Sequence, residues 1–180
     1  MDNELKEKIS KSITGFRLPR YKEITDVGLY LEQTVRYVNA QLKPLGEAEI
    51  TGSMVSNYVK QKLVANPQKK QYCAEHIARL IFISIVKISM SLEDISMMRL
   101  QQEYYSPRVA YDYFCDEFEN MLNDAFGIAE AVEGLGDTES EAKDLLQITI
   151  MSAVKKIYLN QYLVAFRETL HRNRTESETS

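Results

Sequence analysis

Residues 50–95 constrain the fold more than any other stretch of this chain. They hold a short segment with polar residues on one side, a basic loop with Pro67, a nearly all-apolar run, and a last segment that opens at Ser91. Apolar residues recur three and four positions apart, which predicts helices, and Asn66-Pro67 forbids one continuous helix. A polar-faced helix followed by a basic loop is the order that a winged helix-turn-helix needs to contact DNA.

The first helix of this stretch is predicted to run from Thr51 to about Lys62. Thr51 and Ser53 are residues of the type that caps a helix N-terminus. One side of the helix carries apolar residues every four positions, which can face a core: Val55, Val59 and Leu63. The other side carries short polar and basic residues: Ser53, Ser56, Asn57, Lys60 and Gln61. We therefore predict that this is a recognition helix.

Each residue type on the polar side suits a particular contact with DNA. Serine, asparagine and glutamine hydrogen-bond to base edges, and asparagine can bind adenine through two hydrogen bonds. Lys60 and Lys62 are expected to contact phosphates. Thr51 and Ser53 lie at the amino end of the helix, where free N–H groups and the helix dipole favour a phosphate. The alternative is that the segment is an ordinary helix of an all-α core.

The loop from Pro67 to Tyr72 is polar and is predicted to form a small β-wing. Lys69 and Lys70 stand together beyond the recognition helix, where two cations can grip the DNA backbone without reading sequence. Two lysines in a loop are otherwise simply solvated. This signal therefore gains its meaning only beside the predicted recognition helix.

The rest of the chain also predicts helices. One is expected from Asp26 to Pro44-Leu45-Gly46. Another runs from Ala74 to about Ile88, where about 15 residues exceed the length of a usual strand. A further helix begins at Ser91, where Asp94 completes a capping box, and ends near Tyr105. Two more begin at Pro107 and at about Glu139. Gly134 to Asp137 should break the chain before the last helix, which is expected to end at His171. The fold class predicted is all-α with a small β-wing.

Charge and composition place this fold in a soluble setting. The net charge of −4 hides an asymmetry, because residues 1–90 carry +5 and residues 91–180 carry −9. A basic region can bind nucleic acid even in a chain with a pI of about 5.4. The start has no apolar core of a signal peptide, no run approaches a membrane span, and two isolated cysteines indicate a reducing compartment. We expect a cytoplasmic protein without a membrane partner.

Four regions follow from these patterns. We expect a charged tail or frayed helix over residues 1–15, a winged helix-turn-helix domain over 16–105, an acidic helical region for dimerisation or effector binding over 106–171, and a disordered tail over 172–180. The apolar stripe of the last helix is too wide for one neighbour. The prediction is therefore a homodimer formed through the C-terminal helices.

The stretch also resembles a known pattern. The bacterial MerR regulators have a recognition helix that ends in a Gly-Leu step, a basic wing with a tyrosine, an apolar helix and a SLEEI-like segment. The chain is similar over these residues: Val55-Ser56-Asn57-Tyr58, Lys62-Leu63-Val64, Pro67 to Tyr72, His76 to Ile83 and Ser91 to Ile95. The resemblance implies that Tyr58 and Tyr72 also lie at the DNA surface. Ser56-Asn57 replaces the usual Arg-Tyr and Lys62 replaces the usual glycine, so no operator sequence is implied.

A longer resemblance covers most of the chain. Together with Phe16 to Tyr21 and Ile50 to Lys60, the sequence is similar to the bacterial family catalogued as domain of unknown function 1836. That family implies no activity. The usual MerR coiled coil is also missing, because the helix from Ser91 meets Pro107 after about 15 residues.

The sequence gives little support for catalysis or for a bound metal or cofactor. His76 and His171 have no paired ligands, neither cysteine has a base beside it, and no glycine-rich phosphate loop occurs, so we expect no enzyme, no cofactor and no metal. The acidic residues of the helix after Pro107 are predicted to be a solvated face: Asp112, Asp116, Glu117 and Glu119. Four tyrosines could line a pocket for a small-molecule effector or simply pack together: Tyr104, Tyr105, Tyr111 and Tyr113. A protein effector is the other possibility left open.

The function expected is a sequence-specific DNA-binding transcriptional regulator that reads a two-fold related operator in double-stranded DNA. The competing hypothesis is a helical adaptor that binds another protein and no DNA. The acidic second half and the wide stripe of the last helix would fit that alternative.

Overall fold

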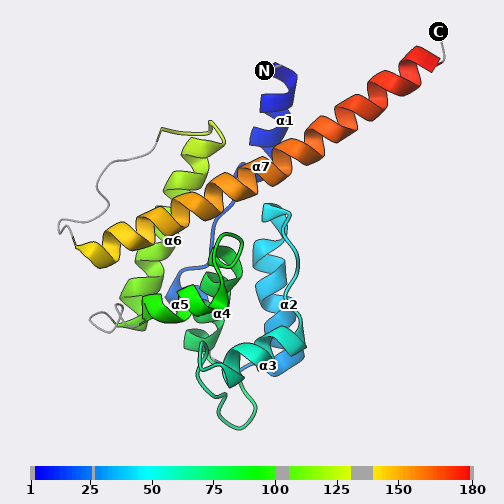
Figure 1. Ribbon diagram of the computed structural model, residues 1–180. Helices are drawn as coiled ribbons and strands as arrows, with labels where there is room; N and C mark the ends of the chain where they lie inside the picture. The colour runs from blue at the N-terminus through cyan, green and yellow to red at the C-terminus, as the bar shows by residue number, and fades with distance from the viewer. Residues whose placement is uncertain (1–2, 26, 100–105, 131–139, 179–180) are drawn as a thin grey trace.

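The computed structural model describes residues 3–25, 27–99, 106–130 and 140–178, and this part of the chain is helical. The helices are α1 (Asn3–Ile13), α2 (Leu31–Leu42), α3 (Gly52–Lys60), α4 (Ala74–Val86), α5 (Leu92–Arg99), α6 (Pro107–Ala125) and α7 (Glu141–Glu178), with short 3-10 turns η1 (Tyr21–Glu23) and η2 (Lys43–Leu45). Helix α7 crosses the molecule beside α6 and α1, while α3 and the 67–72 loop lie at the opposite end (Figure 1). The prediction of an all-α protein is confirmed.

Helix α4 lies at the centre of the core. It contacts α2, α6, α7 and η1. The helix is buried on all sides, and its completely buried side chains, at 0% exposure, include Ile77, Leu80, Ile81, Ile83 and Ile85. A helix that is apolar all round needs such surroundings, since no face of it can be left in water. The choice of helix over strand for this β-branched run is confirmed.

The N-terminal segment, which was predicted to be a charged tail or a frayed helix, is a packed helix. Residues 3–13 form α1, which packs against α7 through Leu5, Ile9 and Ile13. An ion pair between Lys8 and Glu168 also joins the two helices. Three apolar residues spaced four apart make a thin stripe on an otherwise charged helix. Such a stripe becomes a packing surface only because α7 offers its own apolar side.

Helix α2 begins later than predicted. Its N-terminal cap is Tyr30, whose N–H donates to Gln33 Oε1 at 2.9 Å, and Val27 is 71% exposed. Asp26, the predicted cap, lies outside the described residues. The helix ends where expected, since η2 contains Pro44 and Gly46 takes a left-handed φ of 71°.

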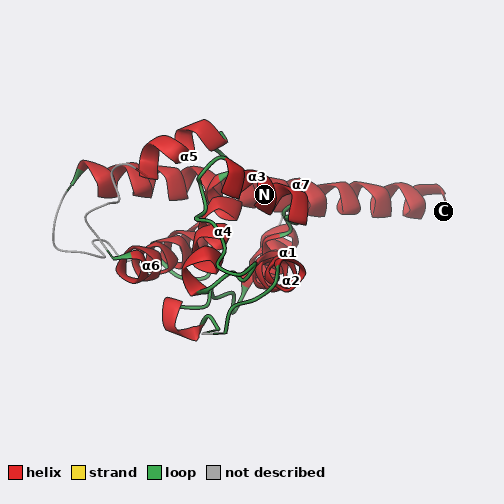
Figure 2. Cartoon of the chain, turned by 90° about the horizontal axis from the view of Figure 1, so that it is seen from below, coloured by secondary structure: helices red, strands yellow, loops and turns green. Residues whose placement is uncertain are grey.

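The second half of the chain shows both agreement and difference. Ser91 caps α5 as predicted, with its Oγ accepting from the Asp94 N–H at 3.1 Å, and Pro107 opens α6 behind a Ser106 cap. The predicted end near Tyr105 and the break from Gly134 to Asp137 lie outside the described residues. Helix α7 continues to Glu178, although residues 172–180 were predicted to be disordered. Its C-terminal part extends beyond the other helices, as the view from below shows (Figure 2).

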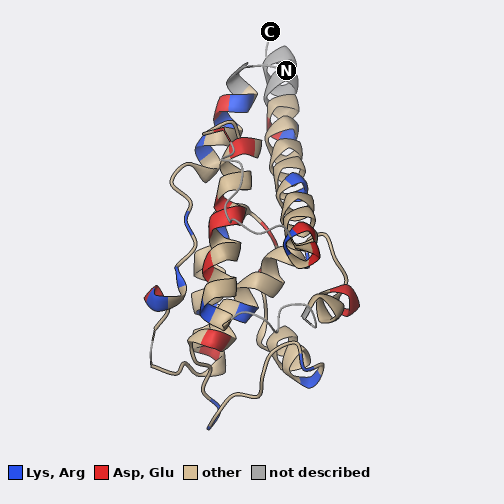
Figure 3. Cartoon of the chain, turned by 90° about the vertical axis from the view of Figure 1, so that its left-hand side faces the viewer, with Lys and Arg blue, Asp and Glu red and all other residues tan. Residues whose placement is uncertain are grey.

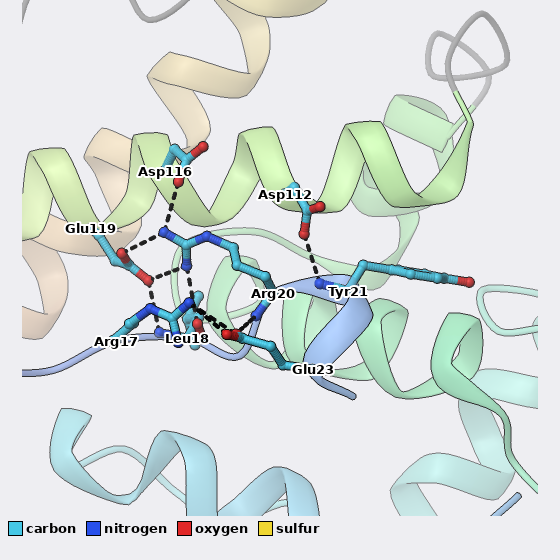
Figure 4. A network of polar contacts seen from close by, with 8 residues as sticks. All are labelled: Arg17, Leu18, Arg20, Tyr21, Glu23, Asp112, Asp116 and Glu119. Carbon is cyan, nitrogen blue, oxygen red and sulfur yellow. Dashed lines mark hydrogen bonds and ion pairs between the residues drawn. The ribbon is translucent and has the colours of Figure 1, made fainter. Parts of the chain in front are cut away.

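The acidic residues of α6 are not the solvated face that was predicted. Residues 17–23 dock on them in a cluster that we call the Arg20 junction (Figure 4). The Arg20 guanidinium donates to Glu119 Oε1 at 2.6 Å, to Glu119 Oε2 at 2.8 Å and to Asp116 Oδ1 at 2.7 Å. Glu119 and Asp112 also accept the backbone N–H groups of Leu18 and Tyr21, each at 2.7 Å.

The Arg20 junction ties the chain's N-terminal part to α6. The Arg20 and Glu119 side chains are only 18% and 16% exposed, so a bidentate pair here is shielded from much of the solvent. The hydrogen bond from Arg20 to Glu119 raises the pKa of the guanidinium further above its usual range. The fourth acidic residue, Glu117, is buried at 3% exposure. Four carboxylates that looked alike in the sequence therefore have different surroundings.

Candidate nucleic-acid interface

Helix α3 is held by its apolar side and by its cap. Thr51 Oγ1 accepts the Met54 N–H at 3.2 Å, so the predicted N-terminal cap is confirmed. Val55 and Tyr58 are 0% and 2% exposed, whereas Val59 is only partly buried. The inner face is thus defined by a three-residue step to Tyr58, instead of the four-residue steps through Val59 that the sequence suggested.

Asn39 of α2 fixes the segment that leads into α3. Its side-chain Nδ2 donates to the Ile50 carbonyl at 3.0 Å, and its Oδ1 accepts the Ile50 N–H at 2.9 Å. Both hydrogen bonds are partly buried. They satisfy the backbone of the residue just before the Thr51 cap, so the start of α3 is fixed relative to α2. Sequence reasoning missed this residue, because an asparagine inside a helix gives no sign of a partner eleven positions away.

The outward face of α3 carries the polar residues that were predicted to contact DNA. These residues are exposed: Thr51, Ser53, Ser56, Asn57, Lys60, Gln61 and Lys62. Ser56, Asn57 and Gln61 are already held by side-chain hydrogen bonds on the helix. Ser56 Oγ donates to the Gly52 carbonyl at 2.9 Å, and Gln61 Nε2 donates to Asn57 Oδ1 at 3.3 Å.

Lys62 has a backbone conformation that glycine adopts more easily. Its φ is 60°, and it follows the C-terminal cap Gln61. The Lys62 N–H donates to Val59 O at 3.0 Å and the Leu63 N–H donates to Tyr58 O at 2.9 Å, which together form a Schellman motif. Glycine usually occupies this position because a Cβ is strained there. Lys62 thus occupies the position after a helix C-terminal cap that glycine takes most easily.

The 67–72 loop turns through two more lysines in the same conformation. Lys69 and Lys70 have φ values of 49° and 65°, and the Gln71 N–H donates to Gln68 O at 2.8 Å. Positive φ at both central residues is the signature of a type I′ turn, where Asn-Gly is the usual pair. The predicted wing is reduced to two isolated bridges, one between Gln68 and Gln71 and one between Leu29 and Tyr72. The described residues contain no strand longer than these bridges. The reason is that only Tyr72 and Cys73 lie between the turn and the first residue of α4, which leaves no room for a longer strand.

The loop is anchored at its base by the segment before α2. The Leu29 N–H donates to Tyr72 O at 2.9 Å, and the Tyr72 N–H donates to Leu29 O at 2.8 Å. Gly28 lies so close that an added Cβ would be 2.8 Å from the Cβ of Gln71. The loop therefore has a fixed position beside α3, with both of its lysines exposed at the tip.

Two predicted DNA contacts lie in the core instead. Tyr58 and Tyr72 are 2% and 5% exposed. Lys87 Nζ donates to Tyr58 Oη at 3.3 Å, and burial raises the pKa of Tyr58 and lowers that of Lys87. Tyr72 packs edge-on against the His76 ring, with 5.7 Å between ring centroids. Their side chains support α3 and the loop from behind, because each has an apolar ring that the core can bury.

The remaining exposed residues of α3 and the loop form one surface, which we call the α3–loop surface. It includes Lys60, Lys62, Lys69 and Lys70, and no Asp or Glu occurs between Glu49 and Glu75. Blue segments, which mark lysine on α3 and in the loop, lie at the lower end of the molecule (Figure 3). A surface with four cations, hydroxyls and amides has the chemistry of a nucleic-acid contact.

The other candidate residues have structural surroundings. His76 is 7% exposed and its Nδ1 accepts the Cys73 N–H at 3.1 Å, so it caps α4 from within the helix. Tyr111 is buried and packs against Tyr21 and Phe114. Tyr104 and Tyr105 lie outside the described residues, so the choice between an effector pocket and simple aromatic packing stays open for them.

A second exposed feature lies on α7. Its apolar residues face two ways: Leu146, Ile150, Val154 and Ile157 are buried, whereas Leu159, Leu163, Phe166 and Leu170 are 37–46% exposed. The exposed four follow steps of four, three and four residues, which place them on one side of the helix. We call them the α7 stripe.

Comparison with known proteins gives one match. The sequence profile of a family described as "Domain of unknown function (DUF1836)" matches residues 19–114, which include Arg20, α2, α3, the loop and α4. No curated protein and no solved structure matches the chain. Among the described residues, the helices include none with the length and apolar character needed to cross a membrane.

Proposed function

We propose that this chain, which belongs to the DUF1836 family, is a sequence-specific DNA-binding transcriptional regulator. In this proposal α3 enters the major groove and the 67–72 loop contacts the flanking backbone, in the manner of a MerR-like winged helix-turn-helix. The family match covers α3 and the loop but carries no activity with it. The chemistry of the α3–loop surface is what supports DNA binding.

One observation carries the proposal. Among the described residues, the non-glycine residues with positive φ are Lys62, Lys69 and Lys70, and all three are exposed on the α3–loop surface. Each stands where glycine or asparagine would be less strained, by roughly 1 kcal/mol per residue. Strained residues persist mainly where function requires them. A cation at three such positions is explained by a polyanion, whereas simple solvation would be served as well by glycine or asparagine.

The surface divides the work of recognition between two kinds of residue. Lys69 and Lys70 lie at the tip of the loop and would contact phosphates, as would Lys60 and Lys62 at the end of α3. Such contacts add affinity that falls with salt and carries no sequence information. The short polar residues of α3 would then face base edges. The support from Asn39 keeps the start of α3 in place during this contact.

The two-fold operator requires a dimer, for which the α7 stripe is the candidate interface. Leu159, Leu163, Phe166 and Leu170 repeat at coiled-coil spacing on the side of α7 that is turned away from its buried residues. Two copies could therefore approach along α7 without a clash between their cores. Static light scattering on the purified protein tests this, with Leu163→Glu plus Phe166→Glu expected to give a monomer that keeps its helical circular dichroism.

The DNA proposal is tested by fluorescence anisotropy with random-sequence duplexes at several salt concentrations. About six phosphate contacts per dimer give a slope of log K against log salt near −5. Lys69→Glu plus Lys70→Glu should weaken binding to all duplexes and make the slope shallower. The matched control is Lys155→Glu plus Lys156→Glu, an adjacent exposed pair on α7, which should leave binding almost unchanged.

The two pairs separate local contact from overall charge. If both double variants weaken binding equally, the loop has no special role and only net charge matters. If the wild-type protein retards no duplex at low salt, DNA binding itself is wrong.

One observation favours a second candidate, a helical adaptor that binds another protein. The α7 stripe exposes large apolar residues, and contiguous apolar surface of this kind commonly marks a protein partner. An adaptor predicts no dependence on Lys69 and Lys70. It also predicts that the wild-type protein binds no DNA and that substitutions in the α7 stripe abolish binding of the protein partner.

A further inference from the structure

The side chains of Asn57 and Gln61 form a hydrogen-bonded pair on the outward face of α3. They lie one helical turn apart and both are exposed. Gln61 Nε2 donates to Asn57 Oδ1 at 3.3 Å. The hydrogen bond gives the Asn57 amide one orientation, because only its oxygen, and not its NH₂ group, can accept from Gln61.

The orientation leaves a particular set of groups available for a ligand. Asn57 Oδ1 has two lone pairs, so one remains after Gln61 is bound, and both N–H groups of Nδ2 remain as donors. The free edge of Asn57 therefore offers an acceptor and a donor side by side. In the major groove, adenine shows the complementary edge, since its N6 amino group donates and its N7 accepts.

We propose that α3 reads an adenine through Asn57 and that Gln61 is a positioning residue that holds the Asn57 amide in the reading orientation. The inference rests on the proposed DNA-binding function and specifies the base pair that the same surface recognises. Gln61 acts through Asn57 and contacts no base in this scheme. Because the amide is oriented before binding, less side-chain freedom is lost when the base is bound.

The neighbouring Ser56 points to the same class of base. Its hydroxyl proton is used in the hydrogen bond to the Gly52 carbonyl at 2.9 Å, so Oγ can act only as an acceptor toward a ligand. A base contacted by Ser56 must then donate, as adenine N6 and cytosine N4 do. Guanine presents only acceptors in the major groove and finds no donor at Ser56. On the outward face of α3, Lys60 is the cation that would suit guanine, and it serves as a comparison in the test.

The first experiment selects bound duplexes from a random library with the wild-type protein and four variants. The wild type should enrich A·T at one position in each half-site. Gln61→Met keeps the length of the side chain but cannot donate, and should reduce the adenine preference roughly two- to ten-fold. Gln68→Met makes the same substitution in the loop and should leave the preference unchanged. Lys60→Gln should weaken binding to all sequences alike, and Asn57→Ala should abolish the preference.

The second experiment removes one acceptor from the base. A duplex with 7-deazaadenine at the enriched position has a C–H group in place of N7. Wild-type affinity for this duplex should fall about ten-fold, the loss expected for one half of a good bidentate contact. The Asn57→Ala variant should bind the two duplexes equally. Thermal unfolding of each variant confirms that the fold is kept.

The outcomes separate the inference from the proposed function. If the wild-type protein binds duplexes tightly but enriches no adenine, the adenine assignment is wrong and DNA binding stands. If Gln61→Met and Gln68→Met give the same preference as wild type, Asn57 reads the base without help and the positioning role is wrong. Enrichment of guanine that disappears in Lys60→Gln would assign the reading to Lys60. A wild-type protein that binds no duplex overturns both proposals.

Discussion

The Arg20 junction and the α3–loop surface use positive charge in opposite ways. At the junction, one arginine is fixed by two carboxylates and by the Leu18 carbonyl, and it is largely shielded from solvent. On the α3–loop surface, four lysines are exposed, and Lys60, Lys69 and Lys70 form no ion pair within the described part of the chain. At the Arg20 junction, the charge of Arg20 is neutralised by carboxylates and stabilises the fold. On the α3–loop surface, Lys60, Lys69 and Lys70 keep their charge available for a partner, and Lys69 and Lys70 do so in strained backbone conformations.

The two cysteines provide the largest expected contrast, because one lies in each region. Cys73 follows the loop and is exposed, whereas Cys115 is buried on α6 between Asp112 and Asp116 in sequence, and burial raises its pKa to about 12. Since the thiolate is the reactive form and Cys115 is buried, a thiol reagent at pH 8 should modify Cys73 much faster than Cys115. Mass spectrometry of the native protein over time measures both rates.

Two variants check the thiol assignment. Cys73→Ser should remove the fast phase, and Cys115→Ala should leave it intact. A fast phase that survives in Cys73→Ser would mean that the Arg20 junction opens readily in solution.

The next effect concerns the two arginines of the junction. Arg20→Ala leaves Glu119 shielded without its cation and should lower the free energy of unfolding by about 3 kcal/mol. Arg17→Ala is the matched control, since the Arg17–Glu23 pair is 53% and 38% exposed and should contribute much less to stability. Urea denaturation followed by circular dichroism gives both values. Equal losses would show that shielding does not set the difference between these pairs.

The smallest effects have opposite signs for stability and for binding. Lys62→Gly and Lys70→Gly relieve a positive φ and should each raise the free energy of unfolding by roughly 1 kcal/mol. Each should also weaken DNA binding and make its salt slope shallower by about 1 per copy. Lys60→Gly is the control, because α3 needs helical backbone there and glycine should lower stability by about 1 kcal/mol. These values come from thermal unfolding and fluorescence anisotropy on the same preparations.

The changes in stability and in DNA binding together show whether the strained lysine backbone serves binding. Glycine variants that are more stable and bind DNA as well as wild type would separate the strained lysines from function. Variants that gain no stability would show that the lysine backbone is not strained at these sites.

Local features of the chain could be predicted because they depend on neighbours in sequence. The caps at Thr51 and Ser91 need only a backbone N–H three residues ahead. The length of the apolar run after Ala74 predicts helix α4, and the end of α2 follows from Pro44 and Gly46. The φ of 60° at Lys62 was not predicted, and only the structure shows it.

Burial depended on contacts that no local pattern contains. Tyr58 and Tyr72 were predicted to face DNA, but an amphipathic ring can face either way, and α4 and its flanking residues cover both. Arg20 and Glu119 are 99 positions apart, so nothing in either segment shows that they pair. Residues 3–13 form a packed helix only because α7 lies beside them.

The sequence by itself determined most of the segments that become helices, where most of these begin, and that a basic polar segment lies in residues 50–73. These properties follow from backbone preferences, capping and periodicity within a few residues. Only the tertiary structure decided which tyrosines leave that segment for the core, which acidic residues hold Arg20, and which lysines stay exposed in strained conformations. Those outcomes depend on which distant elements meet, because burial and charge pairing are properties of the contact and not of the residue alone.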